Sequence, residues 1–369
     1  MINVFGSLVG KEEIDEVTET LNSQWLGLGN KVEEFEDLFS KKFNLQYFSM
    51  VDSGSNALFL ALKLLNLPKN SEVILPSFTW VSCAQAVLMC DLKPVFCDVD
   101  INSMNITAKT VATKITSRTS AIMVVHYAGL PVDMEPIIKF GIPIIEDAAH
   151  AVYSKYKGSQ CGSIGDIGIY SFDAVKNLTC AEGGGITSKS KEIIDRAKYL
   201  RYCGIGKSGF QNSSADSKKN WWEYDIREPF IKMLPNNITA SIGIAQLKKI
   251  DLLQKKRKDI WSLYQNELCN SIKQPKDVDN ISDQHSYFTY CIQVDKRNEL
   301  SKYLYSKGVY TTLRYHPLHM NGIYNQINQE LPNTKLLNER ALSIPIHPNM
   351  TTKEASYVAS QINKFYDIN

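Results

Sequence analysis

The first two thirds of the chain alternate between segments with helical hydrophobic spacing and short apolar runs. Residues 13–26 and 31–43 repeat apolar side chains at intervals of three and four, which predicts two amphipathic helices. Later segments with similar spacing predict helices at 57–65 and 81–90. Runs rich in Val, Ile and aromatic residues predict strands at 47–52, 72–75, 94–98, 121–126, 143–147, 167–172 and 185–187. This alternation predicts an α/β fold with a mostly parallel sheet covered by helices on both faces.

The pattern changes in the last third of the chain. Residues 237–268 predict one long helix, and we interpret its Lys and Arg cluster at 248, 249 and 255–258 as a solvated face. Beyond it, a strand at 288–294 lies between helical patterns, which predicts a smaller α+β unit.

We therefore expect a large domain over residues 1–250 and a small C-terminal domain over residues 251–369. Within the expected large domain, the Gly- and Ser-rich stretch 204–219 predicts a long loop. Long loops inside compact domains are usually functional or disordered.

Composition narrows the class of protein. A chain of 369 residues with 44% hydrophobic and 22% charged residues is long enough for a large core. The formal net charge of +2 argues against nucleic acid as a partner, because phosphate binding needs a concentrated basic face. No apolar run is long enough to span a membrane, and none opens the sequence as a secretory signal. Eight cysteines without a Cys-x-x-Cys pair fit a reduced, cytoplasmic protein.

A possible anion site follows the first predicted strand. Ser53-Gly54-Ser55-Asn56 joins that strand to a helix, and free N–H groups at a helix N-terminus favour an anion such as phosphate. The alternative is a simple helix cap made by Ser55 or Asn56.

Two acids end the strand at 143–147. Ligands of open α/β sheets gather at the carboxyl ends of strands, so Asp147 is placed to hold a protonated ring nitrogen or a metal. A capping role for this aspartate is the alternative. His150 follows three residues later.

A lysine follows the next buried strand. Lys176 comes shortly after residues 167–172 and just before the glycine-rich run 183–185. A lysine held away from water has a lowered pKa and becomes nucleophilic, which makes Lys176 a candidate for imine formation. A surface lysine in a turn is the alternative. Taken together, a phosphate cup, an acid and this lysine match the needs of pyridoxal phosphate.

These residues belong to a longer ordered set of motifs. The motifs are Ser53–Ala57, Pro76–Trp80, His126 with Gly129 and Asp133-Met134, Glu146–Ala151, Gly165–Asn177, Ala240–Leu247 and Pro317–His319. In this set and order the sequence resembles the DegT/DnrJ/EryC1/StrS family of sugar aminotransferases. The resemblance implies the fold-type I architecture of pyridoxal-phosphate-dependent transferases and covers nearly the whole chain.

The resemblance also implies roles for residues around the cofactor ring. Lys176 bonds to the cofactor and then moves the proton between substrate and cofactor. Asp147 pairs with the ring nitrogen, Trp80 stacks on the ring, and His150 lies near the ring hydroxyl.

Further roles concern the phosphate and the substrate. The resemblance implies that Ser55, Asn56 and Ser171 bind the phosphate. Lys232 would reach the phosphate from the partner subunit of a homodimer with shared active sites, although the usual Gly-Tyr pair before it is absent. His319 is expected to contact substrate; a metal role for His316 and His319 is disfavoured because no Cys or carboxylate cluster accompanies them.

The implied activity is transfer of an amino group from L-glutamate to a keto group of a nucleotide-linked sugar, for surface polysaccharide or related amino-sugar biosynthesis. Relatives that act at C-3 often carry Asn-x-Arg-Leu-Asp before the long helix, whereas this chain has Lys232–Asn236. That difference favours C-4 of a 4-keto-6-deoxy sugar. Two alternatives stay open: another pyridoxal-phosphate enzyme, such as the family's sugar dehydratase branch, and a catalytically silent regulatory homologue.

Overall fold

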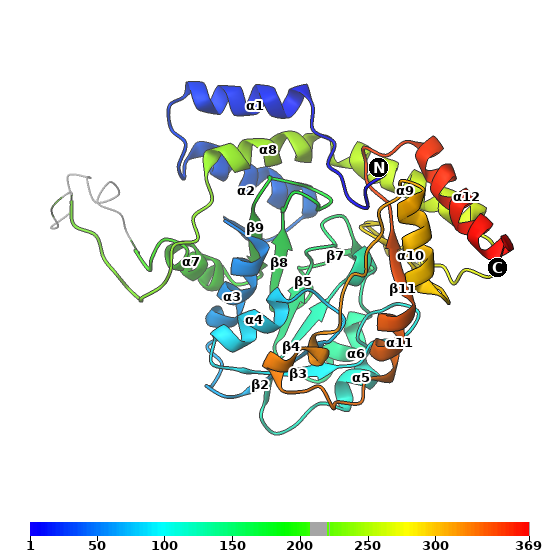
Figure 1. Cartoon of the computed structure of the whole chain (residues 1–369). Helices are drawn as coiled ribbons and strands as arrows, with labels where there is room; N and C mark the ends of the chain where they lie inside the picture. The colour runs from blue at the N-terminus through cyan, green and yellow to red at the C-terminus, as the bar shows by residue number, and fades with distance from the viewer. Residues whose placement is uncertain (207–219, 221, 369) are drawn as a thin grey trace.

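A mixed sheet forms the centre of the computed structural model, which describes residues 1–206, 220 and 222–368 (Figure 1). Its seven strands are β1 (Tyr47–Val51), β2 (Glu72–Pro76), β3 (Lys93–Cys97), β4 (Thr119–Val125), β5 (Ile144–Asp147), β8 (Ile167–Ser171) and β9 (Gly184–Ser188). Their spatial order is β1-β9-β8-β5-β4-β2-β3. Strand β9 is antiparallel to β1 and β8, and the other neighbouring pairs are parallel. The predicted mostly parallel α/β sheet is confirmed.

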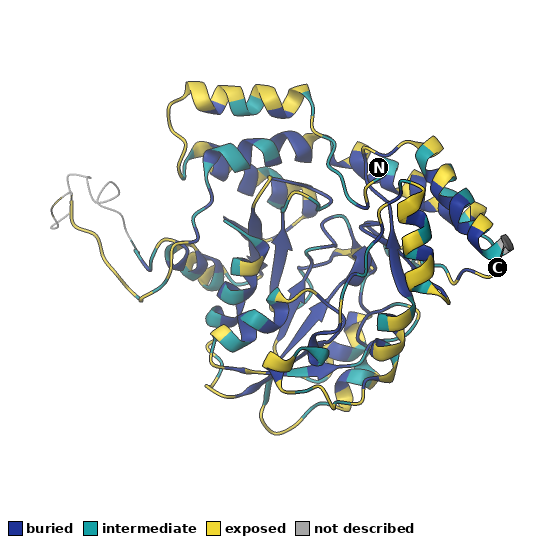
Figure 2. Ribbon diagram, viewed as in Figure 1, coloured by how far each residue is buried: buried dark blue, intermediate teal, exposed yellow. Residues whose placement is uncertain are grey.

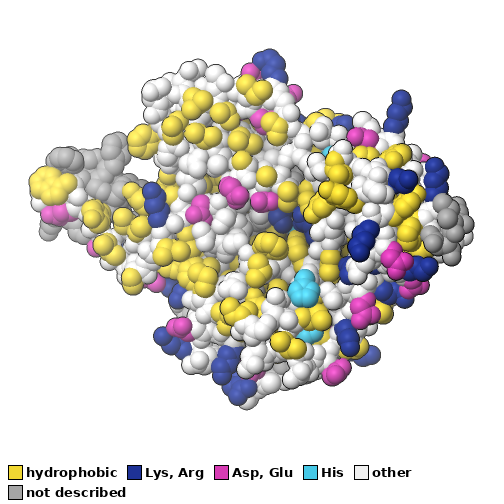
Figure 3. All heavy atoms as spheres, in the orientation of Figure 1, with side chains coloured by type: hydrophobic (Ala, Val, Ile, Leu, Met, Phe, Trp, Pro, Cys, Tyr) yellow, Lys and Arg dark blue, Asp and Glu magenta, His cyan; other side chains and the backbone are white. Residues whose placement is uncertain are grey.

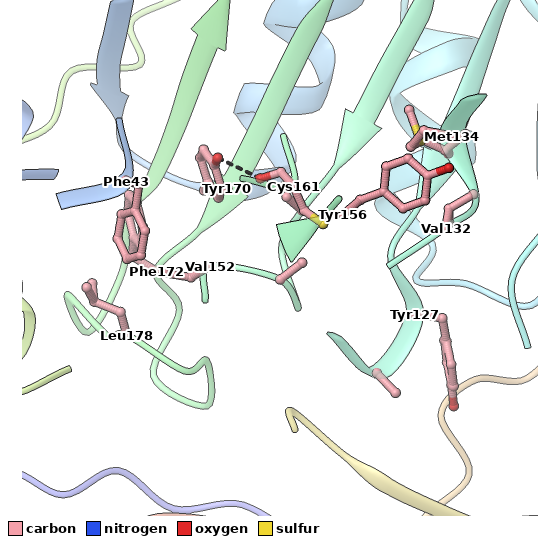
Figure 4. Close-up of a cluster of buried hydrophobic side chains, with 14 of the residues drawn as sticks. Phe43, Tyr127, Val132, Met134, Val152, Tyr156, Cys161, Tyr170, Phe172 and Leu178 are labelled. Atoms are coloured by element: carbon pink, nitrogen blue, oxygen red, sulfur yellow. Dashed lines mark hydrogen bonds between the residues drawn. The ribbon is translucent and has the colours of Figure 1, made fainter. Parts of the chain in front are cut away.

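Alternate side chains of the strands enter two different cores. In β4, Ile122 and Val124 belong to one hydrophobic cluster, and Met123 and Val125 belong to the other. Figure 2 shows that most strand residues are buried. Figure 4 shows part of the first cluster, where the Tyr170 hydroxyl donates to the carbonyl of Cys161 at 2.7 Å.

Helices from distant parts of the sequence cover the two faces. The first cluster includes residues of α2 (Asn30–Phe43) and α8 (Asn237–Lys248). The second includes residues of α3 (Gly54–Leu64), α4 (Ser82–Met89) and α7 (Lys191–Leu200). Helix α1 packs against α8 at the outside. The smaller elements around this unit are α1 (Lys11–Asn22), α5 (Ala108–Ala112), α6 (Met134–Ile138), β6 (Lys155–Tyr156) and β7 (Ser159–Gln160).

A third hydrophobic cluster lies in the C-terminal part. It joins residues of α9, β10, α10, β11 and α12, beginning at Ile260, with Ile2 packed against it. The elements of this region are α9 (Ile250–Glu267), β10 (Tyr290–Gln293), α10 (Arg297–Ser306), α11 (Pro332–Arg340), β11 (Ala341–Ile344) and α12 (Thr352–Ile368). The division of the chain into domains at residue 250 stays a prediction.

The prediction of one long helix over residues 237–268 is wrong in one respect. The segment forms two helices, α8 and α9, which are separated at Lys249, where the backbone takes φ −111° and ψ 13°. The Lys249 amine lies 2.7 Å from a carboxylate oxygen of Glu13 on α1, so this position is fixed by a tertiary ion pair. The cluster we interpreted as a solvated face also contains a fully buried side chain, Arg257, which donates to the carbonyls of Phe288 and Ile346.

Three further findings concern the predicted loop, the cysteines and membrane-spanning helices. Of the predicted loop at 204–219, residues 207–219 lie outside the described residues. All eight cysteines are free. Among the described helices, none combines the length and apolar character needed to cross a membrane.

Candidate active site

The carboxyl ends of the parallel strands meet at one edge of the sheet, and a cavity of about 500 Å³ opens there. Strands β1, β5 and β8 end directly before or within the predicted functional residues. Six of the predicted residues line this cavity: Ser55, Trp80, Asp147, His150, Ser171 and Lys176. The fold thus brings together residues that are far apart in the sequence.

Asp147 is the last residue of β5 and is buried. One carboxylate oxygen accepts a hydrogen bond from the backbone N–H of Ala149 at 2.9 Å, and the other accepts from Sγ of Cys83 at 3.2 Å. Burial raises the pKa of Asp147, and these hydrogen bonds act in the opposite direction. A buried carboxylate with so few donors is suited to pairing with a cationic ring nitrogen.

The neighbouring acid, Glu146, is already occupied by the protein. Its carboxylate lies 3.0 Å from Nε2 of His126 and accepts backbone N–H groups of Gly162, Ile164 and Gly165 at 2.6–2.9 Å. The Nδ1 atom of His126 accepts the N–H of Val132, so Nε2 carries the proton toward Glu146. Glu146 therefore holds loops together, and of the two acids that end β5 only Asp147 lines the cavity.

Lys176 lies in the loop after β8, with its ammonium 4.9 Å from the centroid of the Phe288 ring. Burial and the nearby Arg314 cation lower the pKa of Lys176 to about 8, against the opposing effect of Asp147. The loop itself is anchored by Asn177, whose side chain donates to the carbonyl of Ser286 at 2.6 Å. Lys176 therefore has the lowered pKa that a nucleophilic amine needs near neutral pH.

The start of α3 forms a cup beside the end of β8. The Ser53 side chain accepts the N–H of Asn56, which leaves the N–H groups of Gly54 and Ser55 without partners inside the helix. The hydroxyls of Ser55 and Ser82 lie 2.6 Å apart at its rim. A Cβ atom at Gly54 would come within 2.6 Å of Cβ of Ser171, so only glycine allows this close approach. This arrangement suits a phosphate group.

The predicted residues Trp80 and His150 add aromatic rings to the cavity wall. Trp80 is 54% exposed, and its ring centroid lies 5.5 Å from that of Tyr315. His150 stacks on Phe288 at 4.1 Å, and its Nε2 lies 3.1 Å from the Tyr315 hydroxyl. Burial, with the cations of Lys176 and Arg314, holds the pKa of His150 well below its usual value, so its imidazole is neutral. Its buried Nδ1 has no partner among the described residues, which fits an atom that awaits a ligand group.

The other three predicted residues do not line the cavity. The Asn56 side chain donates to Asp52 at 2.8 Å. Lys232 is exposed and forms a β-bridge with Tyr202. His319 is buried, with Nδ1 2.6 Å from the Ser77 hydroxyl. The roles expected for these three residues stay predictions.

The sequence reasoning missed several residues of the cavity wall. Arg314 and Tyr315 line it directly, Phe5 reaches it from the N-terminus, and Cys83 and Phe288 contact residues within it. The only sequence signal nearby was Pro317–His319, which directed attention a few residues too far along the chain. The neighbourhood of Phe5 and Arg314 arises only in three dimensions.

The donor set has a definite chemical capacity. An amine of lowered pKa, a buried carboxylate, a phosphate cup and a neutral imidazole share one cavity. These residues fit pyridoxal phosphate, which needs an amine for its aldehyde, an acid for its ring nitrogen and N–H donors for its phosphate. In the described part of the chain, no three His, Cys, Asp or Glu side chains gather as metal ligands.

Comparisons with known proteins agree with this chemistry. The dTDP-4-dehydro-2,3,6-trideoxy-D-glucose 4-aminotransferase of Saccharopolyspora spinosa is 34% identical, over 99% of this chain and 96% of its own length. The structure of the aminotransferase TlmJ from Streptoalloteichus hindustanus superposes with a TM-score of 0.93 at 32% identity, covering 100% of this chain and 99% of that one.

A third relative has been solved with and without its cofactor. Spr1654 from Streptococcus pneumoniae, named as a sugar aminotransferase, is 26% identical to this chain. Its PLP form superposes with a TM-score of 0.90, covering 99% of this chain and 98% of that one. Its PMP form superposes with a TM-score of 0.92. The sequence model of the DegT/DnrJ/EryC1/StrS aminotransferase family matches residues 8–363. With the motifs, the fold and the cavity in agreement, this chain belongs to the DegT/DnrJ/EryC1/StrS aminotransferase family.

Proposed function

We propose that the protein transfers an amino group from L-glutamate to the C-4 keto group of a nucleotide-linked 4-keto-6-deoxy sugar. The observation that carries the proposal is the placement of Lys176, with its lowered pKa, in one cavity with the buried Asp147. Family membership indicates pyridoxal phosphate as the cofactor. When bound, the cofactor supplies an electron sink that stabilises negative charge on the substrate carbon.

The chain's own residues have separate tasks in this proposal. Lys176 would hold the cofactor aldehyde and, once displaced by the substrate amine, its Nζ would carry the proton between the substrate carbon and the former aldehyde carbon of the cofactor. Asp147 keeps the ring nitrogen protonated. The N–H groups of Gly54 and Ser55, with the hydroxyl of Ser171, hold the phosphate. Trp80 covers the ring from the open side, and the neutral His150 presents Nδ1 to a polar ring substituent.

The choice of sugar rests on the relatives and on one segment of the sequence. The Saccharopolyspora spinosa relative is named for 4-amination of a dTDP-linked keto sugar. Residues 232–236 lack the pattern that often accompanies C-3 specificity. Both facts support C-4. In the dehydratase branch of the family this chain resembles, histidine stands in place of the lysine that bonds to the cofactor, so the intact Lys176 argues against that branch. It also argues against a silent homologue, which is free to lose the lysine. A cytoplasmic location and a surface polysaccharide as the end product remain predictions.

The active unit in this proposal is a homodimer with shared sites. Lys232 is exposed and lies outside its own chain's cavity, so its expected phosphate contact requires a second subunit. Figure 3 shows hydrophobic side chains gathered over the outer helix α1. The exposed large apolar residues in this region are Val9, Ile14, Leu21, Trp25 and Leu26. Such a patch marks a surface suited to a protein partner.

A half-reaction tests the proposed function directly. The pyridoxamine form of the protein is mixed with dTDP-4-keto-6-deoxyglucose, and the return of the cofactor to its aldehyde form is followed by absorbance. We expect stoichiometric return within a single turnover and a product that carries a new amine at C-4. A 3-keto sugar nucleotide should react far more slowly. No reaction with any keto sugar nucleotide, or amination at C-3, contradicts the proposal.

A further inference from the structure

Arg314 is a buried cation on the wall of the cavity without an acidic partner. The described arginines that pair with carboxylates are Arg118, Arg196, Arg201 and Arg340. Within the described residues, Arg314 has no such pair, and its Nη1 donates only to the Tyr315 hydroxyl at 3.1 Å. A charge removed from water is costly unless an opposite charge compensates it, so this position calls for an anionic ligand.

Aromatic rings fix the orientation of this guanidinium. Its Cζ atom lies 3.6 Å from the centroid of Phe5 and 4.9 Å from that of Phe288. Rings that pack on a guanidinium face leave the N–H edge for hydrogen bonding. The backbone carbonyl of Arg314 also accepts the hydroxyl of the buried Tyr127, which holds the segment in place. A planar fork held in this way suits a carboxylate, which it binds with two parallel hydrogen bonds.

Arg314 and the reacting amine of Lys176 line the same cavity and pack on the same aromatic ring. Both Arg314 Cζ and Lys176 Nζ are 4.9 Å from the centroid of the same Phe288 ring. The Arg314 cation is one of the two causes that lower the pKa of Lys176. An anion bound by Arg314 would therefore lie close to the bond-making atoms, not at the mouth of the cavity.

We propose that Arg314 binds the α-carboxylate of the amino-acid donor and makes no comparable contact with the sugar substrate. This assignment rests on the proposed function. In an amino acid the carboxylate is attached to the carbon that bears the reacting amine, so it must lie near Lys176. In a nucleotide-linked 4-keto sugar, the diphosphate is attached across the sugar ring from C-4. That diphosphate therefore lies away from Lys176 and Arg314. One site thus serves two unlike substrates, and Arg314 is a specificity residue for only one of them.

The test separates the two half-reactions with the variants Arg314→Gln and Arg314→Lys. The pyridoxal form is mixed with L-glutamate, and in parallel with the nucleotide-linked 4-amino sugar, which donates its amine without a carboxylate. For Arg314→Gln we expect kcat/KM for glutamate to fall by about 100-fold or more, the effect of losing a bidentate charged contact. Loss of the Arg314 charge also acts on Lys176 in both half-reactions, so the readout is the ratio of the two values: kcat/KM for the amino sugar should fall at least tenfold less than kcat/KM for glutamate. Arg314→Lys keeps the charge without the fork and should lie between Arg314→Gln and the unchanged protein.

A binding measurement keeps this test independent of the sugar chemistry. Glutarate carries carboxylates and no amine, and its affinity for the pyridoxal form is read from the cofactor spectrum. We expect Arg314→Gln to weaken glutarate binding at least tenfold. Arg340→Gln, a matched loss of an arginine that pairs with Asp295 at the surface, should change nothing. If no sugar nucleotide reacts but glutarate binding depends on Arg314, the proposed function fails and the assignment stands. Equal losses with both amine donors, or unchanged glutarate binding, overturn the assignment.

Discussion

Lys176 has neighbours that act on its charge in opposite directions. Burial and the cation of Arg314 favour the neutral amine, and the carboxylates of Asp147 and Asp173 favour the ammonium. Burial and Arg314 have the larger effect, and the pKa of Lys176 is lowered to about 8. An ordinary lysine has a pKa near 10.4 and is almost fully protonated at pH 7. A surface lysine in the same loop would lack this property, so the environment and not the residue type makes the nucleophile.

The first prediction concerns the pH dependence of cofactor uptake. Only the neutral amine attacks the aldehyde, so uptake by the apoprotein should be slow below the pKa of Lys176 and rise with pH, with a midpoint of about 8. Because Arg314 lowers this pKa, Arg314→Gln should move the midpoint to higher pH. Stopped-flow absorbance at a series of pH values measures both. A midpoint near 10 in the unchanged protein would contradict this account of Lys176. So would a midpoint that Arg314→Gln leaves unchanged.

The second prediction concerns Asp147. Asp147→Asn preserves the shape but cannot keep the ring nitrogen protonated, so turnover should fall by several orders of magnitude, or roughly several kcal/mol of barrier. Lys176 should still take up the cofactor. Spectral titration for uptake and steady-state kinetics for turnover separate the two effects. Glu146 offers no substitute, because its carboxylate is held by His126 and backbone N–H groups. Activity retained within about tenfold would show that another group does this work.

At the residue scale, the sequence could predict Lys176 and Asp147 because each lies at or just after the end of a buried strand, where ligands of such sheets bind. It could not predict Arg314. Nothing in the local pattern around residue 314 distinguishes an arginine that lacks an acidic partner from one that is paired at the surface. The distinction depends on Phe5 and Phe288, which are distant in the chain.

At the scale of elements, the site depends on how closely α3 approaches the end of β8. Gly54 is the first residue of α3 and lies against Ser171, the last residue of β8. The position of β8 is fixed in turn by its pairing with β9 in the sheet. Continuous apolar runs predicted the strands to within a few residues, because most strands of the sheet are buried on both faces. The break between α8 and α9 escaped prediction, because Lys249 is compatible with a helix and the break depends on tertiary contacts.

The third prediction tests this close approach. Gly54→Ala places a methyl group 2.6 Å from Cβ of Ser171, so α3 and β8 must separate and the phosphate cup widens. We expect cofactor affinity to fall at least tenfold, measured by fluorescence titration of the apoprotein. Gly322→Ala is the matched control, since nothing lies within 4 Å of the added atom. Equal affinities for both variants would show that the cup does not bind the phosphate.

At the scale of the whole molecule, the proposed shared site makes assembly part of catalysis. Residues of one cavity come from the start of α3, from β5 and β8, and from the segment around Arg314, yet Lys232 remains outside it. A doubly charged phosphate held by N–H groups and hydroxyls gains from a nearby cation. The isolated chain does not supply that cation from Lys232, so the proposal places this lysine in the site of a second subunit.

The fourth prediction uses mixed subunits. Lys232→Ala should weaken cofactor retention and leave Lys176 able to bond to the cofactor. In hybrid dimers with Lys176→Ala, one site carries both lesions and the other carries neither, so activity should return through the intact site. Activity is compared before and after mixing, with native mass spectrometry to establish that hybrids form. Hybrids without activity above the Lys232→Ala background, or a fully active monomer, rule out shared sites.

The central claim, that Lys176 holds the cofactor until the amine of the donor displaces it, can be tested by one trapping measurement. The holoprotein is reduced with borohydride, digested and mapped by mass spectrometry, with and without prior exposure to L-glutamate. We predict that the cofactor is found on Lys176 in the untreated protein and is largely absent from it after glutamate, because the cofactor then holds the amine. Cofactor on a different lysine, or equal labelling of Lys176 in both samples, would contradict the account.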